Sequence, residues 1–537
     1  MVALPTERAR QRLIFLAAAV GTSLPVIAGT VRAVHDGWVP IGDRAIIAVR
    51  AYDVFGSHSP LVGQYSASSH VLGHTLYSLG PLLYWLLALP VRLNSPAALT
   101  ITAGALNVAA AAGIVVLARR RGGETLMIGT AIAVALMCSS LSAETFHDIW
   151  NPSAAVLPFT LLAFLCWSLA CGEYRLLPVT VLVASFVVQC QLTYLLPSLG
   201  LLAVAMVGLW LSRRGTAAAG VRRWAVLAVA VALVCWSAPL LDQVFHAPGN
   251  LVRVARTGTA GESTLGATVG ARAVVRAIGV PPWWLRAAGD PFGRAGEVRV
   301  AAHTVGVLTA VLVLAAVVAV AVLAVRRRRV ELASAAAISL VLCAALWSVA
   351  AGTPTRHSLV SSLGYTLWWG SPAGMWVWLM LAYSALALLP HRPVGPFALP
   401  AGAVAAIGVA VAIVASARAD QDLARYHEVS SVIDRVDAVP IRAKTVRVEG
   451  SPAYLFTNFD FKAAIIYSLR RRGIHVVSSG AAPRLGSSYE PRSGSYQAEI
   501  LVDASGAPLG AGQREIARSS ATVAPGVVRT VTVRLAE

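Results

Sequence analysis

Acidic and basic side chains gather in one short stretch near the N-terminus, where Asp43, Arg44, Arg50 and Asp53 are followed by His74. A carboxylate in such a group can take the proton of a hydroxyl that attacks an anomeric carbon, while arginines neutralise a phosphate leaving group. Sugar transfer from a phospholipid needs both functions. We therefore predict Asp43 as a general base. The alternative is that these side chains only solvate a loop.

The residues between Asp43 and Asp53 have a spacing compatible with an amphipathic helix. At 3.6 residues per turn, Asp43, Arg50 and Asp53 point toward one broad side of that helix. A shared site is therefore expected. We take Asp53 as a second catalytic candidate, and Arg44, Arg50 and His74 as substrate-binding candidates.

A second acidic group stands in residues 144–152, which read ETFHDIWNP. His147 and Asp148 lie beside Trp150, and an acid next to an aromatic ring suits a sugar. We predict a catalytic role for Asp148 and substrate contacts for His147 and Trp150. The alternative is an interfacial anchor, because Trp is common at the headgroup level of a membrane and Pro often begins a helix.

The elements that position these residues must lie in a membrane. Hydrophobic residues make up 57% of the 537 residues and charged residues only 13%, with a mean hydropathy of +0.69. This is too little charge to cover a soluble surface of that size. Apolar blocks such as Val305 to Val325 are long enough to cross a hydrocarbon core of roughly 30 Å.

The arginines indicate the orientation of the chain. The formal net charge is +19, but the basic residues cluster at the ends of apolar blocks, as in Arg119 to Arg121 and Arg326 to Arg329. This pattern is typical of cytoplasmic loops rather than of a nucleic-acid binder. The block Leu13 to Val31 follows basic residues and lacks a convincing cleavage site, so we predict a retained anchor with a cytoplasmic N-terminus.

The same rule predicts about eleven spans in a multi-pass protein of the cell (plasma) membrane. They lie near residues 13–31, 97–117, 126–141, 154–170, 176–190, 195–211, 224–241, 303–325, 331–350, 371–390 and 397–416. The block Leu76 to Val91 is broken by Gly80, Pro81 and Pro90, and we expect it to lie at the outer interface.

The predicted fold class is a mostly helical polytopic bundle with a small extracytoplasmic α/β domain. The membrane domain covers residues 1–416, with external loops at 32–96, 144–153 and 242–302, and the α/β domain covers residues 417–537. Val446 to Gly450 and Ile474 to Val477 are predicted strands, and Asn458 to Arg472 is a predicted helix that ends at Gly473.

External arginines run against the usual charge bias and are candidates for binding lipid phosphate or headgroups. These are Arg92, Arg253, Arg256 and Arg356. The pairs Trp283-Trp284 and Trp368-Trp369 suit either an aromatic belt, which is the commoner use, or stacking on sugar rings. The six cysteines form no CxxC pair, and no Walker loop, GxSxG elbow or HExxH motif is present. We predict no cofactor; a divalent metal is not indicated.

Several of these features together resemble the GT-C superfamily of integral membrane glycosyltransferases, to which protein O-mannosyltransferases and aminoarabinose transferases belong. They are the Gly-Asp at 42–43, the acid at Asp53, the segment LGPLLYWLLALP at 79–90 and a basic-ended second span. The resemblance implies that Asp43 serves as base and that Asp148 supplies a second acid. The family's paired acidic motif is Gly-Asp-Arg here, and the usual His-Pro-Pro or Pro-Gly-Pro reads Ser-Leu-Gly-Pro at 78–81, which makes metal use doubtful.

The resulting expectation is a membrane enzyme that moves a sugar from a polyprenyl-phosphate carrier to an envelope glycan, lipid or protein on the outer face. One alternative is a multi-span transporter or lipid-linked glycan flippase, which would carry inverted repeats and ionisable residues at mid-membrane. Another is a non-catalytic scaffold whose external domain binds a glycan or a protein.

Overall fold

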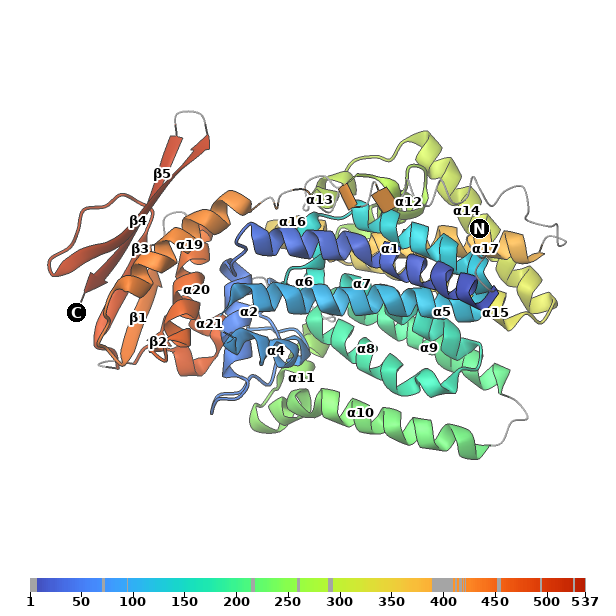
Figure 1. The fold of residues 1–537 in the computed structure, drawn as a ribbon, viewed down its shortest axis with the longest axis horizontal. Coiled ribbons are helices and arrows are strands. Elements are labelled where there is room, and N and C mark those ends of the chain that lie inside the picture. The colour runs from blue at the N-terminus through green and yellow to red at the C-terminus, as the bar shows by residue number, and fades with distance from the viewer. Residues whose placement is uncertain are drawn as a thin grey trace, which may run out of the picture. The chain divides into compact units, whose positions relative to one another are not determined.

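A computed structural model describes most of the chain, in two units (Figure 1). The structure describes residues 7–536 except 70–72, 94, 214–217, 258–260, 288–292, 389–408, 411–412, 415–417, 419, 421, 452–454, 493–494 and 525–526. The helical unit comprises Met1–Thr30, Gly104–His147 and Asn151–Arg418, and the mixed unit comprises Val31–Ala103, Asp148–Trp150 and Ala419–Glu537. The predicted boundary between residues 416 and 417 falls near the start of Ala419–Glu537, and the mixed unit also contains residues 32–96, which were predicted as the first external loop.

Long apolar helices build the helical unit. Its elements are α1 (Glu7–His35), α5 (Pro96–Ser139), η2 (Ala143–Phe146), α6 (Asn151–Ala154), α7 (Val156–Ala170), η3 (Tyr174–Leu176), α8 (Leu177–Cys190), η4 (Leu192–Tyr194), α9 (Leu195–Ser212), α10 (Ala218–Phe245), α11 (Asn250–Thr257), α12 (Gly266–Ile278), η5 (Trp283–Leu285), α13 (Arg294–Glu297), α14 (Thr304–Arg326), α15 (Val330–Ala351), α16 (His357–Thr366) and α17 (Gly370–Leu388). Within the described ranges, eight helices are long and apolar enough to cross a membrane. The prediction of a polytopic membrane bundle is therefore confirmed.

The predicted crossings correspond to these helices, and two of the predicted crossings lie in the single element α5. The spans predicted at 97–117 and 126–141 lie in α5, where Gly122 and Gly123 leave helical geometry and Gly123 has a φ of 65°. Glycine adopts this conformation without a steric penalty, so the chain turns between two helices there. The span predicted at 176–190 is the short helix α8, and the one predicted at 397–416 falls mostly on residues outside the described ranges.

Aromatic side chains fill the middle of the helical unit. Helix α7 packs on α8 and α9, and α15 packs on α7, α9, α14 and α17. Trp167 of α7 meets Trp376 of α17 edge to face at 5.9 Å, and Phe164 meets the same ring at 5.0 Å. Such tilted contacts are favoured by the ring quadrupoles. They join helices that are far apart in the sequence.

The mixed unit contains short helices between residues 42 and 92 and a five-stranded sheet from the C-terminal region. Its elements are α2 (Gly42–Asp53), α4 (Leu82–Leu87), η1 (Pro90–Arg92), α19 (Leu423–Ala438), β1 (Thr445–Gly450), α20 (Leu455–Arg471), β2 (His475–Val477), α21 (Ala482–Leu485), η7 (Ser487–Tyr489), β3 (Ala498–Asp503), β4 (Gln513–Ala524) and β5 (Val527–Ala536). The block Leu76 to Val91 holds only α4 and part of η1, so it is too short to be a crossing, as predicted.

The sheet has the strand order β2-β1-β3-β5-β4. Strands β2, β1 and β3 are parallel, whereas β5 runs antiparallel to both β3 and β4. Helix α20 joins the parallel strands β1 and β2, which is the usual crossover connection. The two predicted strands and the predicted helix are therefore confirmed within a residue or a few at each end, and Gly473 follows the helix at a φ of 77°.

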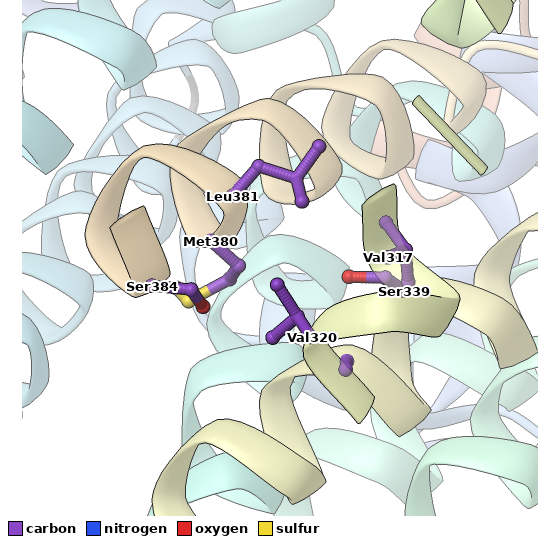
Figure 2. A pocket seen from close by; sticks show the side chains of 7 residues that line it. Val317, Val320, Ser339, Met380, Leu381 and Ser384 are labelled. Carbon is purple, nitrogen blue, oxygen red and sulfur yellow. The ribbon is translucent and has the colours of Figure 1, made fainter. Parts of the chain in front are cut away.

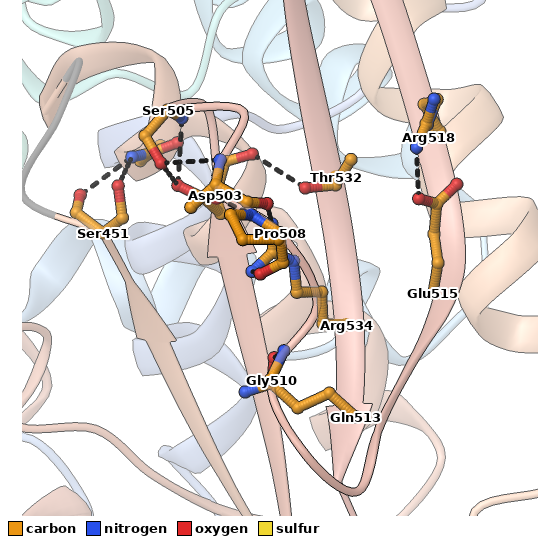
Figure 3. A network of polar contacts seen from close by, with 12 residues as sticks. Ser451, Asp503, Ser505, Pro508, Gly510, Gln513, Glu515, Arg518, Thr532 and Arg534 are labelled. Carbon is orange, nitrogen blue, oxygen red and sulfur yellow. Dashed lines mark hydrogen bonds and ion pairs between the residues drawn. The ribbon is translucent and has the colours of Figure 1, made fainter.

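A buried ion pair ties the antiparallel hairpin to the parallel part of the sheet (Figure 3). Arg534 of β5 donates to Asp503 of β3 over 2.9 Å, and the two side chains are 6% and 2% exposed. Ser505 donates to the same carboxylate through its hydroxyl at 2.6 Å. Burial opposes the charged form of Asp503, but the hydrogen bonds from Ser505 and Ser451 and the guanidinium of Arg534 outweigh it and lower the pKa of Asp503.

Helix α20 lies between the sheet and α2, as Figure 1 also shows. Its apolar residues Phe461, Ile465 and Leu469 have the helical spacing of a single stripe, and all three are fully buried. Helix α2 is buried along most of its length, including Ala45 and Val49. This packing brings α2 against a helix that lies some four hundred residues later in the chain.

Candidate active site

The site is built around the beginning of α2, where Gly42 and Asp43 stand. Gly42 has a φ of 50°, and a Cβ at this position would lie 2.7 Å from Oδ1 of Asp460 in α20. Only glycine suits both the conformation and this close approach. Asp43 follows in the first turn, where a negative charge is stabilised by the helix dipole.

Asp43 is held by two partners and keeps part of its surface open. Nη1 of Arg484 donates to its Oδ1 at 2.7 Å, and Nε2 of Gln64 donates to the same atom at 3.3 Å. The Asp43 side chain is 35% exposed. The carboxylate is therefore oriented while remaining accessible to a ligand.

Arg484 is fixed by aromatic rings. Its guanidinium lies 5.2 Å from the ring of Tyr65 and 4.6 Å from the ring of Phe459. Tyr65 meets Tyr77 edge to face at 5.9 Å, and Tyr77 donates to the carbonyl of Pro483, the residue before Arg484. Tyr65, Tyr77 and α21 thus hold the arginine that orients Asp43.

Asp53 is the last residue of α2, and neighbouring side chains enclose it. It is 5% exposed, and it accepts hydrogen bonds from Arg470 Nη2 at 2.7 Å and from the Tyr489 hydroxyl at 2.6 Å. Burial, together with the charge of Asp53, raises the pKa of Tyr489 and keeps its hydroxyl protonated as the donor. With both oxygens engaged and little surface left, Asp53 has the geometry of a structural anion that joins α2 to α20.

Arg50 also makes contact with the C-terminal region. Its Nη1 donates to the carbonyl of Leu485, and it is 8% exposed. Gly486 follows with a φ of 108°, and a Cβ there would lie 3.3 Å from the same nitrogen. Asp43, Arg50 and Asp53 therefore all bond to residues between 470 and 489.

Asp148 lies in a buried ion pair with Arg44. Nε of Arg44 donates to Oδ2 of Asp148 at 2.8 Å, and the amide of Trp150 donates to Oδ1 at 3.0 Å. Asp148 is 1% exposed. Burial alone would lower the pKa of Arg44. The carboxylates of Asp148 and Asp422 have the larger effect and raise the pKa of Arg44. The Arg44 guanidinium also lies 5.7 Å from the Trp150 ring, so these three residues form one contact group.

Asp460 is a carboxylate at this site that sequence reasoning missed. It lies beside Gly42, and its Oδ2 is 3.7 Å from Nη1 of Arg425. Burial is the main cause that raises the pKa of Asp460 to about 7, with Arg425 opposing and Asp43 reinforcing the shift. The signal in the sequence was an acid in the first turn of the predicted helix Asn458 to Arg472, next to Phe461 of its apolar stripe.

The other predicted substrate-binding residues have varied surroundings. In the mixed unit, Arg92 lies 4.5 Å from the ring of Tyr52 and donates to its carbonyl, whereas His74 is exposed. The helical unit contains His147, which is fully buried, and Arg253, Arg256 and Arg356, which were predicted to be external. Arg253 donates to the carbonyl of Pro248, and Arg356 pairs with Glu262 at 3.1 Å.

The four tryptophans considered for stacking or for a belt are all buried. Trp283, Trp284, Trp368 and Trp369 are between 0% and 9% exposed. Arg294 holds this region together, because it lies 4.8 Å from the Trp283 ring and donates to the carbonyls of Leu367 and Trp368. These rings fill the space where residues 242–302 pack against α17.

A hollow between α14, α15 and α17 of the helical unit offers no chemistry of its own (Figure 2). It is lined by Val317, Val320, Ala336, Ser339, Met380, Leu381 and Ser384. Ser339 donates to a carbonyl of its own helix, and no charged side chain lines the hollow. Among the residues that the structure describes, no group of three His, Cys, Asp or Glu side chains is placed to hold a metal ion.

Comparison with known proteins gives similarity at the level of fold. No protein-family model and no curated protein matches the chain. Among solved structures, ArnT from Cupriavidus metallidurans in the apo state matches over 98% of both chains, with 13% identity and a TM-score of 0.51. The same protein bound to undecaprenyl phosphate matches over 97% of both chains, with 13% identity and a TM-score of 0.55. The chain thus has a polytopic membrane fold similar to that of ArnT, which confirms the fold that the resemblance implied.

Proposed function

We propose that this chain, which shares its fold with ArnT, is a membrane glycosyltransferase that moves a hexosyl or pentosyl unit from a polyprenyl-phosphate carrier to an envelope glycan, lipid or protein. Transfer takes place on the outer face of the cell membrane, where the mixed unit lies, with the N-terminus in the cytoplasm. The ArnT structure with undecaprenyl phosphate supports a polyprenyl phosphate as the lipid part of the donor.

The observation that carries the proposal is the difference in solvent exposure among the three predicted acids. Asp43 is 35% exposed, whereas Asp53 is 5% and Asp148 is 1% exposed, each in a close ion pair. A base must reach the proton that it removes. Asp43 therefore takes the hydroxyl proton of the acceptor, whose oxygen bonds to the anomeric carbon. The bond from that carbon to the phosphate oxygen breaks with inversion, and its electron pair leaves on the polyprenyl phosphate.

The remaining acids and bases have supporting roles. Arg44 and Asp148 hold Trp150 beside the start of α2, and Asp53 holds α2 against α20. The reaction as proposed uses no cofactor and no metal.

The test is transfer by the purified protein from a polyprenyl-phospho-sugar, with Asp43→Asn against wild type. Loss of a general base lowers the rate by about 10² to 10⁴. Glu515→Gln is the matched control, since Glu515 is a carboxylate of the same unit paired only with exposed Arg518. If Asp43→Asn unfolds at the wild-type temperature and transfers sugar at the wild-type rate, Asp43 is not the base.

A further inference from the structure

Asp460 of α20 has a carboxyl group that its neighbours leave without a hydrogen bond. Its ion pair with Arg425 is loose, since Nη1 of Arg425 lies 3.7 Å from Oδ2, and no residue in the described part of the chain donates to it. That nitrogen is buried and likewise has no hydrogen-bond partner among the described residues. The Asp460 side chain is 27% exposed, so a ligand can reach the carboxyl group.

This carboxyl group costs the fold stability at neutral pH. Burial is the main cause that raises its pKa to about 7, so the ionised form is disfavoured where it stands. An acid that costs stability and satisfies no neighbouring donor is typical of a functional position rather than of a structural one. The structural contacts of α20 are made by other residues, such as Phe461 and Arg470.

Gly42 brings Asp460 next to the proposed base. A Cβ on Gly42 would lie 2.7 Å from Oδ1 of Asp460 and 3.6 Å from Cε1 of Phe459, and Asp43 is the next residue of α2. Phe459 also lies 4.6 Å from the guanidinium of Arg484, which donates to Asp43 at 2.7 Å. Two partly exposed carboxyl groups, one from α2 and one from α20, therefore lie around the same glycine.

Aromatic surface accompanies these two carboxyl groups. The rings of Phe459 and Tyr65 lie on either side of the sequence, one in α20 and one in the segment before α4, yet both contact the guanidinium of Arg484. Both side chains are partly exposed. Carboxyl groups accept hydrogen bonds from hydroxyls, and an aromatic ring offers apolar area to the C–H face of a sugar. This combination suits a saccharide.

The charges around Gly42 disfavour an anionic acceptor, because the arginines here are already paired. Five carboxyl groups face three guanidinium groups within 4 Å. The pairs are Arg44 with Asp148 and Asp422, Arg425 with Glu428 and Asp460, and Arg484 with Asp43. Even when Asp460 is protonated, four carboxylates remain. A phosphorylated or sulfated acceptor would add to a negative charge that is already in excess.

We propose that Asp460 binds the acceptor and that this acceptor is an uncharged saccharide. The inference rests on the proposed function and adds a specificity-determining residue from α20. One hydroxyl of the saccharide gives its proton to Asp43 as its oxygen bonds to the anomeric carbon, and the electron pair of the broken bond leaves on the polyprenyl phosphate. A neighbouring hydroxyl of the same sugar donates to Asp460, which exchanges no proton in the reaction.

Binding without donor is the first test, with the full chain in a detergent that contains no sugar. The probes are methyl glycosides of mannose, galactose, glucose and arabinose and the same glycosides phosphorylated at the primary hydroxyl, titrated by saturation-transfer difference NMR. We expect at least one neutral glycoside to bind more tightly than its phosphorylated form. Loss of one hydrogen bond to a carboxylate weakens binding about 10- to 100-fold, so Asp460→Leu should weaken it by that factor.

Glu515→Gln is the matched control and should bind as wild type does, because Glu515 lies in an exposed pair with Arg518. Tighter binding of the phosphorylated glycosides overturns the proposal. So does the absence of binding by every neutral glycoside, or unchanged binding in an Asp460→Leu variant that unfolds at the wild-type temperature.

Kinetics with a polyprenyl-phospho-sugar and the glycoside that binds best provide the second measurement. Asp460→Leu should raise the acceptor KM about 10- to 100-fold and leave the donor KM unchanged. Asp460→Asn should restore part of the loss, because its amide oxygen still accepts from a hydroxyl. An unchanged acceptor KM in Asp460→Leu, or a donor KM that rises equally, overturns the proposal.

The two measurements separate this inference from the proposed function. Glycoside binding that depends on Asp460, in a chain that transfers no sugar from any polyprenyl-phospho-sugar, would refute only the glycosyltransferase function. Transfer that requires Asp43 but uses a peptide or a phosphorylated lipid, with the same acceptor KM in Asp460→Leu, would refute only the saccharide site.

Discussion

Asp460 provides a sharp test of the electrostatics around the start of α2. Its carboxyl group is 27% exposed and its pKa is raised from 3.8 to about 7, first because of burial. The guanidinium groups of Arg425 and Arg44 lower this pKa, whereas Asp422 and Asp43 raise it. Between about pH 4 and pH 7, the Asp460 carboxyl group is therefore protonated in the folded chain but ionised in the unfolded chain. Stability is lost as the pH rises from about 4 to 7.

Asp460→Asn removes this cost and should stabilise the protein above pH 7. One pKa unit corresponds to about 1.4 kcal/mol, so a shift of about three units has an upper value of about 4 kcal/mol. The contact with Arg425 at 3.7 Å that is lost is worth at most about 1 kcal/mol. We expect a net gain of about 2 kcal/mol at pH 8 and none near pH 4.

The assay is thermal unfolding of the full chain in detergent, followed by tryptophan fluorescence at pH values from 4.5 to 8.5. The difference in Tm between Asp460→Asn and wild type should grow up to about pH 7 and then stay level. Glu515→Gln should show no such trend, because Glu515 lies in an exposed pair. A difference that does not depend on pH, or a variant less stable than wild type at pH 8, would refute this account of Asp460.

Three further substitutions test contacts of the mixed unit by the same unfolding assay. Tyr489→Phe removes the hydroxyl that donates to Asp53 at 2.6 Å and should cost about 1–3 kcal/mol; an unchanged Tm would mean that this bond is not needed. Asp503→Asn leaves Arg534 buried without its charge partner and should cost about 3–5 kcal/mol at pH 7. Because the pKa of Asp503 is lowered, that cost should begin to shrink only as the pH falls below the ordinary aspartate pKa of about 4, and a cost that is already smaller at pH 5 than at pH 7 would contradict it. Gly486→Ala meets a φ of 108° and should cost about 1–3 kcal/mol, which an unaltered Tm would disprove.

Local sequence patterns were sufficient to predict the long helices of the helical unit and α2, α20, β1 and β2 of the mixed unit, but not β3, β4 and β5. Apolar length identified the membrane helices, and helical spacing identified α2 and α20, because hydropathy and periodicity depend on neighbours within a few turns. The interruption by Gly80, Pro81 and Pro90 likewise predicted a segment without a long helix, and α4 has only six residues. The class of fold follows from such patterns alone.

Only the tertiary structure decided what each charged residue does. Asp43 and Asp53 are both acids of one helix, yet one is open and the other is enclosed by Arg470 and Tyr489. Arg484 lies 441 residues from Asp43 along the chain, and no local pattern links the two. Burial and ion pairing depend on which distant segments pack together, so the sequence by itself determined where the acids stand but not which of them remains available for chemistry.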